Sequence, residues 1–139
     1  MTIYLDSSVV LRVLFAQRNR LEIWGRWDRA VASELLSLEI RRAIDRLRVQ
    51  GRLDARAVAS LLRDATIVEE SVALVPVSRT VLRRAALPMA TPVRTLDGIH
   101  LATALMMRER AEESLTFATH DVRQGDAARA LGFAVIGTS

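Results

Sequence analysis

Four carboxylates stand at positions from which they could act together chemically. They are Asp6, Glu39, Asp97 and Asp121. Asp6 follows the apolar run 2–5, and Asp121 comes shortly after the apolar run 115–118. Because strand ends and helix starts meet at one edge of an α/β sheet, these acids can converge there. Carboxylates brought together repel one another unless a cation lies among them, so the pattern predicts a divalent metal site.

The absence of cysteine narrows the choice of metal. With no Cys in 139 residues, thiolate-bound zinc, disulfides and cysteine nucleophiles are excluded. Hard carboxylate oxygens select Mg²⁺ or Mn²⁺ over zinc. The sequence therefore predicts Mg²⁺, or Mn²⁺ in its place, at the acidic site.

All 20 basic residues are Arg, and the formal net charge is +4. The missing Lys excludes a Walker A loop, and it excludes the usual phosphotransferases that begin with an Asp at a strand end. Guanidinium groups pair well with phosphate oxygens. If four acids surround a metal, the remaining surface is more basic than the net charge indicates, which favours a nucleic acid partner. Candidates for phosphate contacts, or for a solvated helix face, are Arg41, Arg42, Arg46 and Arg48.

Short apolar runs alternate with amphipathic stretches, which is typical of an α/β domain with a mostly parallel sheet. The expected strands cover residues 2–5, 30–32, 73–77, 115–118 and 134–136. The expected helices cover residues 8–16, 20–28, 34–50, 54–66, 79–87, 96–110 and 122–131. No linker or repeat is evident, so one domain over residues 1–139 is expected. Neither a secretory signal nor an apolar run near the ~20 residues of a membrane span is evident, so a cytoplasmic protein is expected.

Helical geometry places two of the acids beside expected core positions. Glu39 lies on the flank of the apolar stripe that contains Leu36 and Ile40, so its side chain can point inward. Asp97 occupies the first turn of an expected helix and shares a face with apolar residues of that helix, among them Leu101. Both acids can therefore reach the edge of the core.

Simpler interpretations of the acids remain open. An Asp in the first turn of a helix is favoured by the helix dipole and by free backbone amides, so Asp97 and Asp121 could serve only their own helices. Asp126 is a nearby alternative to Asp121 as the fourth acid. Position along the chain does not decide between them.

Four segments of the chain resemble known motifs. They are Ile3-Tyr4-Leu5-Asp6-Ser7-Ser8, residues 33–39, Leu96-Asp97-Gly98-Ile99-His100-Leu101-Ala102-Thr103-Ala104, and Thr119-His120-Asp121. Together they resemble the motifs of PIN-domain ribonucleases, and most closely those of the VapC-type toxins of type II toxin–antitoxin systems. The resemblance covers nearly the whole chain. It implies a PIN-like α/β fold with a central sheet of about five strands and about seven helices.

The resemblance also assigns roles to residues. The four acids match the family's catalytic and metal-binding site, Ser8 matches a hydroxyl beside the first Asp, and Thr119 matches a polar residue near the last acid. Metal ions would bridge the carboxylates and a phosphate oxygen of RNA, and they would activate a bound water. The products would carry 5′-phosphate and 3′-hydroxyl ends. The implied partners are RNA, an inhibitory VapB-type antitoxin and a second copy of the chain, with no role for a membrane.

Two other functional classes stay open. One is a non-catalytic PIN-like module that binds RNA or protein without cleaving RNA. The other is a metal-independent nuclease that uses His100 and His120 as general base and acid, which EDTA insensitivity and cyclic-phosphate products would reveal. For His100, three positions after Asp97, a structural or hydrogen-bonding role is expected. For Trp24 and Trp27, core packing on the face of an expected helix is the simpler interpretation.

Overall fold

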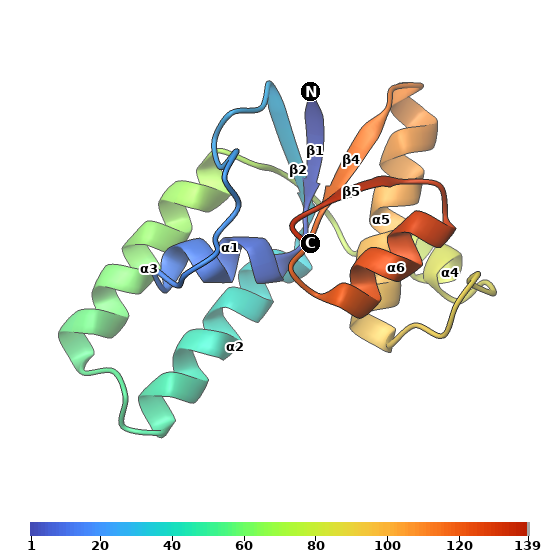
Figure 1. Ribbon diagram of the computed structural model, residues 1–139. Helices are drawn as coiled ribbons and strands as arrows, with labels where there is room; N and C mark the ends of the chain where they lie inside the picture. Colours follow the sequence, from blue (N-terminus) through green and yellow to red (C-terminus); the bar gives the residue numbers. More distant parts are fainter. Residues whose placement is uncertain (139) are drawn as a thin grey trace.

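The computed structural model, which describes residues 1–138, is built around a five-stranded sheet (Figure 1). Its strands are β1 (Thr2–Leu5), β2 (Arg29–Ser33), β3 (Ala73–Val75), β4 (Leu115–Ala118) and β5 (Ala134–Ile136). Their order is β3-β2-β1-β4-β5, and all neighbouring pairs are parallel. The predicted α/β fold is confirmed. Strand β3 ends at Val75, earlier than predicted, because Pro76 has no N–H to donate to a neighbouring strand.

Within residues 1–138, six helices cover the two faces of this sheet. They are α1 (Ser7–Leu14), α2 (Leu35–Val49), α3 (Ala55–Glu70), α4 (Arg79–Ala85), α5 (Thr95–Ala111) and α6 (Val122–Ala130). Helices α1, α2 and α3 lie on one side, and α4, α5 and α6 lie on the other (Figure 1). Since parallel strands are joined by crossovers, a sheet of this kind is buried on both faces.

The side chains of strand β1 alternate between the two faces of the sheet. Ile3 and Leu5 belong to the apolar cluster formed with α1, α2 and α3. Tyr4, between them, belongs to the cluster formed with α5 and α6, where its ring stacks on Phe117 with the centroids 5.0 Å apart. Successive side chains of a strand point to opposite faces. The unbroken apolar run of β1 therefore serves both cores, and it places Tyr4 on the α5 side.

The helices expected over residues 34–50 and 54–66 are present as α2 and α3, which form a helical hairpin (Figure 1). Gly51 adopts φ +73 just after α2, a backbone conformation that glycine accepts readily. Asp54 caps α3 by accepting a hydrogen bond from the backbone N–H of Ala57 at 2.8 Å. Helix α3 runs to Glu70, four residues further than predicted.

The predicted helix over residues 20–28 is wrong, which leaves six helices in residues 1–138 where seven were expected. These residues form turns, because Asn19 and Gly25 adopt φ +58 and φ +80, values that an α-helix does not accommodate. Trp24 and Trp27 nevertheless pack as expected. Their rings meet edge to face with centroids 5.2 Å apart, partly buried against the cluster under α1 to α3.

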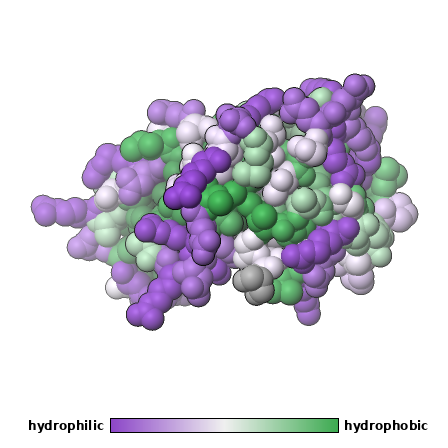
Figure 2. Space-filling model, turned by 45° about the horizontal axis from the view of Figure 1, so that its top comes forward, coloured by the Kyte–Doolittle hydropathy of each residue, from purple (hydrophilic) through white to green (hydrophobic). Residues whose placement is uncertain are grey.

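Apolar side chains are also found on the surface. Figure 2 shows a strip of apolar side chains across the middle of one face, bordered by hydrophilic side chains. On the surface as a whole, Val49, Ile67 and Val122 are each more than 60% exposed. None of the helices in residues 1–138 has both the length and the apolar composition required to cross a membrane.

Candidate active site

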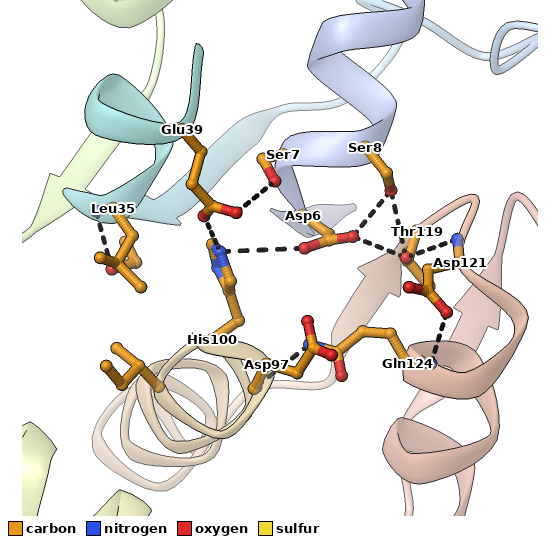
Figure 3. Close-up of polar contacts among 12 residues, drawn as sticks. Asp6, Ser7, Ser8, Leu35, Glu39, Asp97, His100, Thr119, Asp121 and Gln124 are labelled. Carbon is orange, nitrogen blue, oxygen red and sulfur yellow. Dashed lines mark hydrogen bonds and ion pairs between the residues drawn. The ribbon is translucent and has the colours of Figure 1, made fainter. Parts of the chain in front are cut away.

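Asp6 stands at the carboxyl end of the central strand and is almost completely buried. It precedes α1, yet its side chain makes no capping hydrogen bond to that helix. Instead its Oδ2 accepts hydrogen bonds from the hydroxyls of Ser8 and Thr119, each at 2.7 Å (Figure 3). Both hydroxyls predicted to lie beside the acids therefore hold the same carboxylate oxygen.

The same two hydroxyls also bind the loop after β4 and hold it against the start of α1. The backbone N–H of His120 donates to Ser8 Oγ at 2.9 Å, and that of Asp121 donates to Thr119 Oγ1 at 3.1 Å. Since each hydroxyl donates its hydrogen to Asp6 and accepts from the loop, the orientation of both is determined.

Glu39 reaches the site from the first turns of α2. Its Oε1 lies 2.5 Å from His100 Nε2, and its Oε2 accepts a hydrogen bond from Ser7 Oγ at 3.0 Å (Figure 3). His100 Nε2 also lies 3.9 Å from Asp6 Oδ1. The inward orientation of Glu39 predicted from its helix is therefore observed.

Asp97 lies in the first turn of α5 and is partly buried. Burial raises the pKa of its carboxyl, and so do the nearby negative charges of Asp6 and Asp121. The side-chain amide of Gln124 donates to the backbone oxygen of Asp97 at 3.1 Å, which joins α5 to α6. Burial is the larger cause of the raised pKa, and the charges of Asp6 and Asp121 add to it.

Asp121 and Asp126 occupy different environments. Asp121 caps α6 by accepting from the backbone N–H of Gln124 at 3.2 Å, and its charge acts on Asp97. Asp126 is exposed on α6 and pairs with Arg129 at 3.2 Å. Asp121 is therefore both a helix cap and a neighbour of the other acids, whereas Asp126 is engaged elsewhere.

The residues present fit a hard divalent cation by their chemistry. The ligands on offer are carboxylate oxygens, with no thiolate among them. A cation would relieve the repulsion that raises the pKa of Asp97. Within residues 1–138, however, no three His, Asp or Glu side chains are grouped as a ready metal site. Asp6, Glu39 and Asp121 each make hydrogen bonds of their own.

Sequence reasoning missed three residues that contact the acids or their neighbours. Ser7 binds Glu39, Gln124 links α5 to α6, and the Tyr4 hydroxyl lies 2.7 Å from His100 Nδ1. Of these three, only Tyr4 could have been found from the sequence, because side chains alternate along a strand and Tyr4 therefore points away from Ile3, toward α5. The other two depend on contacts between segments far apart in the chain.

Two of the weighed alternatives lose support from the geometry. His100 is 1% exposed, so its ring cannot reach RNA as a general base. The ring of His120 is held by the backbone oxygen of Gly137 at 2.8 Å. On the α2–α3 hairpin, Arg41, Arg42 and Arg48 form ion pairs with acids of the hairpin itself. These three guanidinium groups are therefore poor candidates for phosphate contacts.

Comparison with known proteins establishes the family to which this fold belongs. Residues 3–130 match the family model described as PIN domain. The chain belongs to the PIN domain family.

A relative named as a VapC protein confirms the resemblance found in the motifs. The chain is 34% identical over 143 residues to Ribonuclease VapC46 of Mycobacterium tuberculosis, covering 99% of this chain and 98% of that protein. It also shares its fold with FitAcB from Neisseria gonorrhoeae, at a TM-score of 0.68 and 19% identity. A toxin–antitoxin complex from Klebsiella pneumoniae superimposes at a TM-score of 0.65 and 14% identity. Each alignment covers 98% of this chain and 96% of the other.

Proposed function

We propose that this chain is a VapC-type toxin, an endoribonuclease that depends on Mg²⁺ or Mn²⁺ bound by an acidic site. The observation that carries the proposal is that Asp6, which follows the central strand of a PIN-domain sheet, lies near the His100–Glu39 pair and acts with its charge, as Asp121 does, on Asp97. The relative named Ribonuclease VapC46 supports ribonuclease activity.

The carboxylates have distinct tasks in this proposal. Asp6, Glu39 and Asp97 hold the metal, and Asp121 completes the site or orients a water molecule. Ser8 and Thr119 keep Asp6 in one orientation by donating to its Oδ2. Within residues 1–138 its Oδ1 accepts no hydrogen bond and has His100 Nε2 3.9 Å away, so in this proposal Oδ1 is the oxygen that binds the cation. When bound, Mg²⁺ or Mn²⁺ supplies an activated water and neutralises charge at the phosphate.

The hollows beside the acids support RNA as the substrate. A hollow of 730 Å³ is lined by Arg12, Arg20 and His120, next to the loop that holds Asp6. A smaller hollow of 220 Å³ is lined by Arg94, Arg123 and Asp97 itself. Within residues 1–138, none of these four Arg residues forms an ion pair. Arg12 donates a hydrogen bond to the backbone oxygen of Asn19 at 3.0 Å, so the guanidinium groups of Arg20, Arg94 and Arg123 are the ones available to phosphates on both sides of the acids.

Substitutions of these Arg residues are expected to weaken RNA binding. Arg94→Gln and Arg20→Gln should each lower the affinity for labelled single-stranded RNA. In a plot of the logarithm of the binding constant against the logarithm of the salt concentration, the slope should become shallower by about 0.7 for each lost phosphate contact. The matched control is Arg48→Gln, at the far end of α2, where Arg48 already pairs with Asp45. Binding is measured by fluorescence anisotropy in EDTA. A control variant as weak as the other two would contradict this expectation.

Cleavage of labelled total RNA tests the proposed function directly. With Mg²⁺ or Mn²⁺ the purified protein is expected to leave 5′-phosphate and 3′-hydroxyl ends, and with EDTA to leave RNA intact. Cleavage that persists in EDTA and leaves cyclic phosphates would reject the metal site. Folded protein, free of inhibitor, that cleaves nothing under any condition would favour the alternative, a non-catalytic PIN-like module that binds RNA or protein.

We further propose a VapB-type antitoxin and a second copy of this chain as partners. The structural relative described as a toxin–antitoxin complex supports the first. Apolar side chains on the surface, such as Leu38, Val49 and Ile67, supply area that a partner could cover. Co-expression with the adjacent gene is expected to yield a complex whose nuclease activity is suppressed, and separate elution of the two proteins would count against this partner.

A further inference from the structure

A buried chain of side chains connects the centre of the sheet to one of the candidate metal ligands. Tyr4, on β1, is fully buried, and its hydroxyl lies 2.7 Å from His100 Nδ1. The opposite ring nitrogen, Nε2, lies 2.5 Å from Glu39 Oε1. Figure 3 shows the His100 ring rising from α5 toward Glu39, with Asp6 to its side. Because His100 is 1% exposed, its role is exerted through these neighbours.

Two hydrogen-bond donors in this chain follow from the geometry. The Tyr4 oxygen accepts from the backbone N–H of Ser33 at 3.3 Å. A carboxylate only accepts, so the nitrogen that faces Glu39 must donate. His100 therefore presents its Nε2–H to Glu39, while the hydroxyl of Tyr4 contacts Nδ1 on the other side of the ring.

This donor lies between two carboxylates that would otherwise repel. His100 Nε2 is 2.5 Å from Glu39 Oε1 and 3.9 Å from Asp6 Oδ1. The second oxygen of Glu39 accepts from Ser7, the residue after Asp6. Glu39 therefore contacts a donor at each carboxylate oxygen, Ser7 next to Asp6 and His100 on α5. These two donors set the orientation of Glu39.

We propose that His100 is a positioning residue: oriented by the Tyr4 hydroxyl, it holds the Glu39 carboxylate in the place from which it joins Asp6 in binding metal. The metal-binding part of this inference rests on the proposed function. The part that concerns how His100 holds the Glu39 carboxylate is independent of the proposed function.

Two substitutions separate the contacts of His100. In His100→Gln the amide nitrogen takes the place of Nε2, which keeps a donor to Glu39 and loses Tyr4. In His100→Asn the amide takes the place of Nδ1, which keeps the contact with Tyr4 and loses Glu39. The two variants differ by one methylene, so each serves as the control for the other. Tyr4→Phe leaves the imidazole in place and removes only the hydroxyl that orients it.

Binding of Mn²⁺ alone, measured by titration calorimetry without RNA, is the first readout. His100→Gln is expected to bind within about threefold of wild type, and His100→Asn about 10- to 100-fold more weakly. Tyr4→Phe is expected to fall between them, and because it is nearly isosteric it keeps the test usable if His100→Asn fails to fold. Equal Mn²⁺ affinities for the Gln and Asn variants, or an unchanged affinity for Tyr4→Phe, would overturn the proposal.

Unfolding in urea with EDTA distinguishes failure of this inference from failure of the metal site. Introduced into the wild-type protein, His100→Asn is expected to lower the urea midpoint of unfolding. Introduced into Glu39→Ala, it is expected to lower the midpoint much less, because the contact between His100 and Glu39 is already lost in that variant. If the effect of His100→Asn depends on Glu39 in this way but wild type binds no Mn²⁺, the metal site is rejected. The inference that His100 holds the Glu39 carboxylate in place is then kept. Equal shifts in both backgrounds would overturn the hold, whatever the protein does with metal or RNA.

Discussion

Replacing Asp6 with Asn is expected to slow RNA cleavage by about 10³-fold, which corresponds to about 4 kcal/mol of lost transition-state stabilisation. Asn keeps an oxygen that can accept from Ser8 and Thr119, so the local structure should persist. What disappears is the negative charge at the centre of the proposed metal site. The measurement is the cleavage rate at saturating Mg²⁺, compared between wild type and variant.

Stability provides the check that this loss is chemical. Since Asp97 is repelled by Asp6, removing the charge is expected to leave the midpoint of urea unfolding in EDTA unchanged or to raise it. Asp126→Asn is the matched control, because Asp126 is exposed and paired with Arg129 away from the acids. Its cleavage rate should stay within about twofold of wild type. A control as slow as Asp6→Asn, or an Asp6→Asn variant that cleaves normally, would refute the assignment of the site.

Replacing Gly137 with Ala is expected to lower the free energy of unfolding by about 3 kcal/mol or more. Gly137 follows β5 with φ +98, and an added Cβ would lie 2.4 Å from the backbone oxygen of Thr119. Relief of that clash must move either β5 or the loop that carries Thr119, whose N–H donates to Ile136. Because Thr119 binds Asp6, cleavage should decline as well. Urea unfolding and the cleavage rate measure the two effects.

Gly51→Ala separates the clash from backbone strain. Gly51 also has a positive φ, +73, but an added Cβ there meets no atom within 4 Å. Its substitution is expected to cost only about 1 kcal/mol, from the left-handed backbone alone, with cleavage unchanged. Equal losses in the two variants would show that the end of β5 yields to the extra methyl group without disturbing Thr119.

The contrast between Asp121 and Asp126 shows where local patterns stop being informative. Asp121 precedes α6 and Asp126 lies in the middle of that helix, and chain position alone did not choose between them. In the fold the charge of Asp121 acts on Asp97, whereas Asp126 is exposed and pairs with Arg129, which favours Asp121 as the fourth acid. The mispredicted helix over residues 20–28 has the same origin. Its apolar spacing suited a helix, but Gly25 and the packing of two Trp rings against the core favoured turns.

By itself the sequence determined the five strands, most of the helices and the placement of Asp6, Glu39, Asp97 and Asp121 near element ends. Apolar periodicity and turn residues are local properties that can be read along the chain, and parallel strands bring their carboxyl ends to one edge. Only the tertiary structure decided which groups hold these acids. His100 and Glu39 are 61 positions apart, and Thr119 and Asp6 are 113 apart. Such partners are selected by burial, because a polar group removed from water must find a hydrogen bond wherever the packed fold offers one.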